Sequence, residues 1–146
     1  MIIVFDFQAP ILYDYSMDEV VREKLNKVFQ SYPQIKLVYL FGSQAKGEVG
    51  PLSDYDFAVY FDEKDPKNMF DIKLKLMDQL SRVLGTDEVE IAILNLSEMP
   101  EFKFNVIKEG DLICEEEPFR AMVEPKILNE YFDFKLLLDR YGLTKA

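Results

Sequence analysis

Hydrophobic residues in the first third of the chain recur with two different periods. After Ser16 and Glu19, which form a capping box, apolar residues recur every three or four positions. This spacing predicts a helix over about residues 17–31, closed by a proline. β-Branched and aromatic residues then fill positions 35–41 and predict a buried strand. Residues 2–7 are expected to form a short edge strand or a packed arm.

The middle of the chain repeats this alternation of strand and helix. A second strand is predicted over residues 54–61, where polar and apolar side chains alternate. Asp65 and the proline after it form a helix start, and Gly85 a helix stop, so a helix is predicted over residues 66–84. A third strand is expected over residues 88–94. The apolar stripe of the helix is predicted to contain Phe70, Leu74, Met77 and Leu84.

The C-terminal third is predicted to be mostly helical. Ser97 is expected to cap a short helix that runs to about Lys108, and a short strand follows over residues 112–114. The pattern over residues 118–141 is helical, although Pro125 is expected to kink this segment or to divide it in two.

Together these elements predict a single α+β domain over residues 1–146, with a C-terminal helical segment at about 118–141. Its short strands are expected to form a small mixed β-sheet with flanking helices. The aromatic stretch 131–134 is expected to be a packed helix face, or a surface that a partner covers.

Composition narrows the functions open to such a domain. Apolar residues make up 49% and charged residues 30% of the 146 residues, which is typical of a globular protein. Acids outnumber bases 27 to 17, and the resulting net charge of −10 disfavours direct binding of nucleic acid. The chain has no histidine, which excludes histidine general bases, Ser-His-Asp triads and histidine-ligated zinc.

The same counts bear on the cellular compartment. No apolar run approaches the roughly 20 residues that cross a bilayer. The first ten residues carry no basic residue and contain Asp6, so they do not resemble a signal peptide. The single Cys114 allows no internal disulfide and is typical of a reducing cytosol. A cytoplasmic location without membrane association is therefore expected.

Three acidic residues can meet on one face of the predicted sheet if the two strands that carry them are neighbours. Side chains alternate along a strand, so Asp54 and Asp56 share a face. Glu90 lies on the corresponding face of the next predicted strand, with Asp87 and Glu88 as alternatives for the third acid. Carboxylate oxygens are the ligands that Mg²⁺ prefers, and two such ions can hold a phosphoryl group and activate an attacking oxygen.

A Gly-Ser pair follows the first buried strand. Gly42 allows a polyphosphate to approach the backbone, and the Ser43 hydroxyl and nearby N–H groups can donate hydrogen bonds to it. Ser53 is expected to close the turn before Asp54 with its hydroxyl. Alone, a Gly-Ser pair is usually a turn and an Asp-x-Asp strand is usually a solvated face. Their spacing, their strand context and the later in-phase acid together favour a nucleotide site.

These residues carry a resemblance to a known family. GSQAKGEVGPLSDYDFAVYF resembles the signature of the polymerase-β-type nucleotidyltransferase superfamily, in which Asp-x-Asp on a strand follows Gly-Ser by about ten residues. VEIAIL, FNVIKEGDLICEE and EYFDFKLLLDRYG extend the similarity, over residues 18–143, to the minimal nucleotidyltransferases (MNT). These are the antitoxins of MNT–HEPN toxin–antitoxin pairs. The resemblance implies a polymerase-β-like nucleotidyltransferase fold.

The resemblance also implies a role for each matching residue. It implies a nucleotide-binding set of Gly42, Ser43, Lys46 and Ser53. It implies a catalytic and metal-binding set of Asp54, Asp56 and Glu90, in which Glu90 also helps to deprotonate the acceptor hydroxyl. Two departures stand out. Glu90 replaces a common Asp, and Gln44 and Lys46 stand where many relatives carry Arg, so phosphate contact would lack the bidentate guanidinium.

Relatives in such pairs transfer AMP from ATP to a tyrosine of the HEPN ribonuclease toxin and so silence it. The resemblance therefore implies a Mg²⁺-dependent protein adenylyltransferase with ATP as substrate and a HEPN toxin as partner, in a hetero-oligomer. Two alternatives stay open. One is an antitoxin that neutralises by binding alone and keeps a vestigial site. The other is a small-molecule nucleotidyltransferase of the aminoglycoside type, for which 146 residues leave little room for a second domain.

Overall fold

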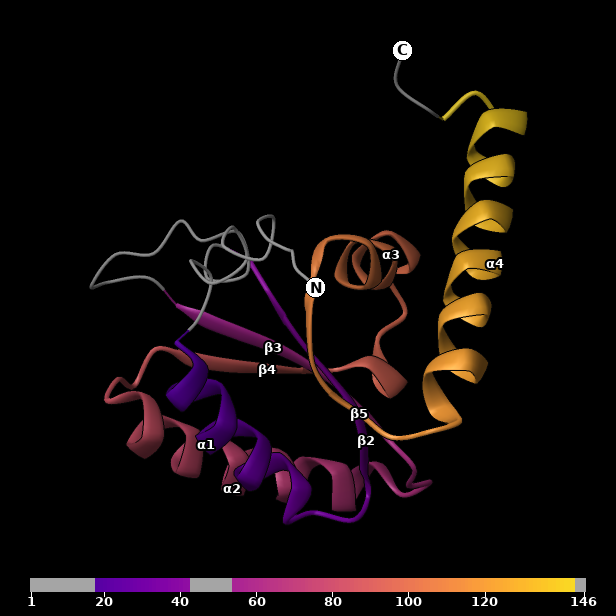
Figure 1. The fold of residues 1–146 in the computed structure, drawn as a ribbon. Coiled ribbons are helices and arrows are strands. Elements are labelled where there is room, and N and C mark those ends of the chain that lie inside the picture. The colour runs from indigo at the N-terminus through magenta and orange to yellow at the C-terminus, as the bar shows by residue number, and fades with distance from the viewer. Residues whose placement is uncertain (1–17, 43–53, 144–146) are drawn as a thin grey trace, which may run out of the picture.

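A mixed four-stranded sheet forms the centre of the computed structural model, which describes residues 18–42 and 54–143 (Figure 1). The sheet order is β4-β3-β2-β5. The strands are β2 (Ile35–Phe41), β3 (Tyr55–Phe61), β4 (Val89–Ile93) and β5 (Asp111–Glu115). β2 pairs antiparallel with both β3 and β5, whereas β3 and β4 are parallel. The predicted α+β class and the mixed sheet are confirmed.

Two helices cover one face of the sheet: α1 (Glu19–Gln30) and α2 (Pro66–Leu84) (Figure 1). α2 has the predicted bounds, because Asp65 caps its first turn and Gly85 ends it in the left-handed conformation. Alternate strand residues point into this layer. Phe57 of β3, for example, packs edge-on against Phe29 of α1, with ring centroids 5.5 Å apart.

Two details of this layer differ from the sequence-based expectation. The cap of α1 is Asp18, whose carboxylate accepts a hydrogen bond from the N–H of Val20 at 3.0 Å, and Ser16 lies outside the described residues. The predicted apolar stripe of α2 is wrong at Phe70 and Leu74, which are 48% and 65% exposed, whereas its Met77 and Leu84 pack against the core. The buried stripe consists of Met69, Ile72, Leu76 and Leu80. Both stripes have helical spacing, so packing against the sheet decides which one is buried.

The opposite face carries a short 3-10 turn, η2 (Leu94–Leu96), and the helices α3 (Pro100–Glu109) and α4 (Phe119–Arg140) (Figure 1). α3 begins after Met99, and Ser97 does not cap it as predicted. The Ser97 hydroxyl instead accepts a hydrogen bond from the Met99 N–H at 3.4 Å. Pro100 at the first helical position starts the helix, because its fixed φ is helical and it has no N–H to satisfy.

α4 is one continuous helix, so the predicted division at Pro125 is wrong. Pro125 lies in the second turn, where it removes one amide donor while its fixed φ still fits a helix. Tyr131 stacks on Phe104 of α3 with ring centroids 3.9 Å apart, as expected for a packed face, but Phe132 is largely exposed. Beyond α3, the C-terminal turns of α4 extend away from the sheet (Figure 1).

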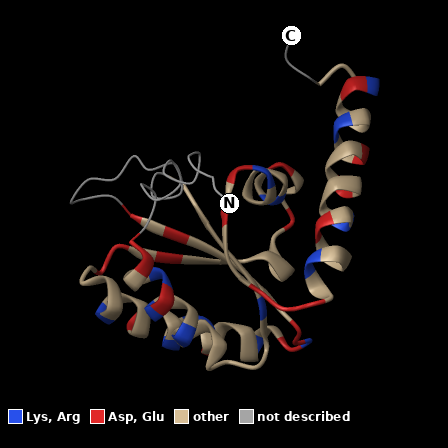
Figure 2. Ribbon diagram, in the orientation of Figure 1, with Lys and Arg blue, Asp and Glu red and all other residues tan. Residues whose placement is uncertain are grey.

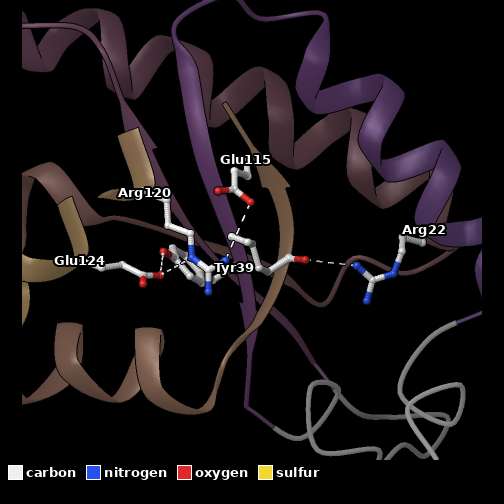
Figure 3. Close-up of polar contacts among 6 residues, drawn as sticks. Arg22, Tyr39, Glu115, Arg120 and Glu124 are labelled. Carbon is white, nitrogen blue, oxygen red and sulfur yellow. Dashed lines mark hydrogen bonds and ion pairs between the residues drawn. The ribbon is translucent and has the colours of Figure 1, made fainter. Parts of the chain in front are cut away.

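A polar network fastens the start of α4 to the sheet (Figure 3). The buried Tyr39 of β2 donates a hydrogen bond to Glu124 Oε2 at 2.6 Å. Arg120 Nε donates to the same carboxylate oxygen at 3.1 Å and its guanidinium also lies 3.9 Å from Glu115. Burial, followed by the hydrogen bond to Glu124, raises the pKa of Tyr39 far above its usual value, so the phenol stays protonated.

The expected strand at residues 2–7 lies outside the described residues. None of the helices in the described ranges combines the length and the apolar character that a membrane span requires.

Candidate active site

Adjacent strands bring the predicted acids together. Asp56 is the second residue of β3, Glu90 is the second residue of β4, and the parallel register pairs them directly. Figure 2 shows the acidic positions of these two strands side by side. Asp54 precedes β3 and is exposed. Asp87 and Glu88 both precede β4, so Glu90 is the acid in register with Asp56.

These acids lie on the α3 and α4 side of the sheet. Phe57 and Val59 of β3 are buried with α1 and α2, so the alternation of side chains directs Asp56 to the other face. In the same way Val89 and Ile91 flank Glu90 and are buried against the α1 and α2 layer. The strand period predicted the face of each acid within its own strand, and the pairing of β3 with β4 brings the two faces together.

The three carboxylates interact electrostatically. The pKa of Asp56 is raised, first by burial and then by the negative charges of Asp54 and Glu90. Like charges held this closely favour protonation or the binding of a cation. The charges of Asp54 and Glu90 therefore both act on the Asp56 carboxylate, after burial as the larger cause.

Gly42 packs directly against this group. It follows β2, and its φ of +81° belongs to the left-handed region, which disfavours residues with a Cβ. A Cβ built on Gly42 would lie 2.9 Å from Asp56 Oδ2, closer than real Cβ contacts. The left-handed conformation thus favours glycine at this position, and a Cβ here would require the Asp56 carboxylate to shift.

The donor set fits a hard divalent cation. Asp54, Asp56 and Glu90 can supply carboxylate oxygens, and a bound cation would relieve the repulsion that, after burial, raises the pKa of Asp56. Over residues 18–42 and 54–143, no three acidic or cysteine side chains converge into a preformed metal-binding cluster. A cation here would need water or substrate oxygens to complete its coordination, as Mg²⁺ commonly does.

A cavity of about 240 Å³ adjoins the acids through Gly42. It lies between the end of β2 and helix α3, and it is lined by Phe41, Gly42, Phe102, Asn105, Val106 and Glu109. Sequence reasoning singled out none of its α3 residues. Their spacing of three, one and three positions is a signal for one helix face, but only the fold shows that this face turns toward the acids.

Of the predicted nucleotide-binding residues, the structure places Gly42 alone. Ser43, Lys46 and Ser53 lie outside the described residues, as does Gln44. Their part in phosphate binding stays a prediction.

Comparison with known proteins connects this geometry to a family. The polymerase beta nucleotidyltransferase family matches residues 23–119, about two thirds of the chain. This chain is a member of the polymerase beta nucleotidyltransferase family, and the matched region contains Gly42, Asp54, Asp56 and Glu90.

Two relatives are named for protein adenylylation. A 44-residue segment is 41% identical to the protein adenylyltransferase MntA of Aphanizomenon flos-aquae and covers 30% of this chain and 29% of that relative. A 67-residue segment is 37% identical to the candidate protein adenylyltransferase MJ1379 of Methanocaldococcus jannaschii. This segment covers 46% of this chain and 65% of that relative. The matches span less than two thirds of the length of either relative.

Solved structures share the fold. One is a toxin–antitoxin complex with AMP-PNP, similar with a TM-score of 0.68 and 20% identity over 82% of this chain and 94% of that chain. Another is the tri-AMPylated HEPN toxin of Shewanella oneidensis in complex with its MNT antitoxin. The TM-score is 0.65 and the identity is 19%, over 86% of this chain and 95% of that chain. At this identity the likeness supports the polymerase-β-like fold that the sequence predicted.

Proposed function

We propose that this chain is an antitoxin adenylyltransferase that transfers AMP from ATP to a tyrosine hydroxyl of a HEPN ribonuclease toxin in the cytoplasm. The observation that carries the proposal is the group of Asp54, Asp56 and Glu90 beside the backbone of Gly42. Membership of a nucleotidyltransferase family and relatives named as protein adenylyltransferases support it.

The reaction needs one bond to form and one to break. The acceptor hydroxyl oxygen attacks the α-phosphorus of ATP, the bond to the β-phosphate oxygen breaks, and pyrophosphate leaves. We assign removal of the hydroxyl proton to Glu90, the role that the family resemblance implies for this acid. Asp54, Asp56 and Glu90 would hold Mg²⁺, which would supply positive charge to neutralise the phosphates.

Gly42 and the residues after it would bind the triphosphate. The left-handed φ of Gly42 turns the chain at the end of β2, and no side chain stands between its backbone and the Asp56 carboxylate. Phosphate oxygens can therefore approach the backbone near the acids. We assign Ser43, Lys46 and Ser53 to the same task, with Ser53 also closing the turn before Asp54.

The proposed partner is a HEPN toxin, with which the chain would form a hetero-oligomer. Similar solved structures are complexes of such a toxin with an MNT antitoxin. A nuclease that binds RNA is expected to expose basic surface, and the net charge of −10 would accelerate and orient its association with this chain. The same charge opposes direct binding of nucleic acid.

Co-expression tests the proposal. The small helical protein encoded beside this chain would be co-expressed with the wild type, with the double variant Asp54→Asn/Asp56→Asn, and with the control Asp62→Asn/Asp71→Asn. The control removes the same charge from exposed residues at the other end of β3 and on α2. The intact mass of the partner should increase by one or more AMP groups with the wild type and the control, but not with the double variant.

Either alternative function would give a different result. An unmodified partner that co-purifies with all three chains would show neutralisation by binding alone, with a vestigial site. An unmodified partner that does not bind would instead favour a small-molecule substrate. Both results would contradict protein adenylylation.

A further inference from the structure

The cavity between β2 and α3 shares a wall with the proposed catalytic site. Gly42 lines the cavity and also packs against Asp56 Oδ2. Phe41, which pairs with Asp56 across the β2–β3 ladder, is a second lining residue. A ligand in the cavity would therefore be separated from the Asp56 carboxylate by Gly42.

One face of α3 forms the opposite wall. Phe102, Asn105, Val106 and Glu109 are separated by three, one and three positions, so they project to the same side of the helix. Val106 is almost fully buried and anchors this face in the core. The ring of Phe102 packs edge-on against Phe41, with centroids 5.4 Å apart and planes at 78°. The wall is thus aromatic and held in place by packing.

The chemistry of the lining differs from that of a phosphate site. Among its described lining residues, Phe41, Phe102 and Val106 are apolar. Aromatic side chains instead stack well on nucleobases. The exposed Asn105 amide offers a donor and an acceptor together, which is the pair that complements the N6 amino group and N7 of adenine.

We propose that this cavity binds the adenine base of ATP, with Phe102 as the stacking surface and Asn105 as the residue that selects adenine. The inference rests on the proposed function and adds the residues that determine which nucleotide the protein prefers. A base in the cavity leaves the sugar and phosphates on the Gly42 side, where Asp56 lies.

The acceptor tyrosine is the competing occupant. Its ring could also stack on Phe102, but a phenol presents a single polar atom, whereas adenine presents a donor and an acceptor side by side. The Asn105 amide matches the purine edge better. The two occupants can be separated because base binding needs only this chain, whereas acceptor binding needs the partner protein.

Isothermal titration calorimetry on the purified chain with Mg²⁺ tests the proposal with three ligands: AMP-PNP, GMP-PNP and tripolyphosphate, which has no base. For Asn105→Ala and Phe102→Leu we expect the affinity for AMP-PNP to fall about tenfold. The affinity for tripolyphosphate should not change. Asn105→Ala should also narrow the preference for AMP-PNP over GMP-PNP. Asn129→Ala, an exposed asparagine of α4 outside the cavity, is the matched control and should bind as the wild type does.

Several outcomes would overturn the assignment. Unchanged AMP-PNP affinity together with impaired transfer to the partner would place the acceptor in the cavity. Equal loss of affinity for all three ligands would show that the cavity residues only support the fold around the acids. In both cases the proposed function would survive and the base site would not. A wild-type chain that binds none of the ligands and modifies no partner would contradict both proposals.

Discussion

Gly42 shows at the scale of one residue how backbone conformation and site chemistry coincide. Its left-handed φ allows the chain to leave β2, and its missing side chain leaves room for the Asp56 carboxylate. Only the first requirement could be predicted from a glycine after a strand. The second depends on the pairing of β2 with β3, which brings Asp56 across from Phe41.

We expect Gly42→Ala to destabilise the fold by more than the cost of the left-handed conformation alone. That cost is about 1–2 kcal/mol for a residue with a Cβ. Gly85→Ala is the matched control, because Gly85 has a φ of +69° but nothing within 4 Å of a built Cβ. Urea unfolding of both variants measures the difference. An equal loss of stability would show that the contact between position 42 and Asp56 relaxes without cost.

Cys114 should react slowly with alkylating reagents in the native protein. Its thiol donates a hydrogen bond to Asn26 Oδ1 at 2.8 Å, and burial raises its pKa from 9.0 to about 11. Since the thiolate is the reactive form, its fraction near pH 8 should fall by about a hundredfold. Mass spectrometry of iodoacetamide labelling in native and unfolded protein checks this.

The raised pKa of Cys114 also makes the stability of the fold depend on pH. Because the native pKa of Cys114 lies above its ordinary value, the protonated thiol stabilises the fold below about pH 9, a contribution lost as pH rises through 11. Labelling of the native protein at the unfolded rate near pH 8 would contradict the raised pKa.

At the scale of elements, helical spacing predicted that α2 and α4 exist but not how each of them packs. α2 carries two apolar stripes, and the sheet buries the one that begins at Met69. α4 contains Pro125 yet remains one helix, with few of its residues buried. Its first turns are held to β2 by the polar network around Tyr39 and Glu124.

We expect Tyr39→Phe to cost about 1–2 kcal/mol of stability, because it removes a buried hydrogen-bond donor from Glu124. Tyr32→Phe removes a hydrogen bond of similar length, 2.8 Å to Gln79, but at an exposed site, so it should cost only a few tenths of a kcal/mol. Denaturant unfolding compares the two. Hydrogen exchange in the first turns of α4 should increase only in Tyr39→Phe. Equal behaviour of both variants would mean that apolar packing alone holds α4.

At the scale of the whole molecule, parallel pairing of β3 and β4 across the α2 connection assembles the acidic group. The strand period placed Asp54 and Asp56 on one face, but the register brings Glu90, rather than Asp87 or Glu88, opposite Asp56. Repulsion among these carboxylates destabilises the metal-free protein, and a bound divalent cation would remove this destabilisation.

Mg²⁺ should therefore stabilise the wild type and not Asp54→Asn/Asp56→Asn. A ligand at ten times its Kd stabilises the native state by about 1.4 kcal/mol, which raises Tm by a few degrees in a protein of this size. Without Mg²⁺ the double variant should be at least as stable as the wild type, because two like charges are gone. Thermal unfolding with Mg²⁺ and with EDTA checks both statements. An unfolded double variant would show that the acids are structural.

Short-range periodicity and turn chemistry in the sequence predicted the element types, most of their bounds and the face of its own strand on which each acid lies. The sequence by itself determined no contact across the sheet. Strand register placed Glu90 opposite Asp56, helix docking chose the buried stripe of α2, and the approach of α3 to β2 created the cavity lined by Phe102 and Asn105. Such contacts join residues far apart in the chain, so only tertiary packing decides them.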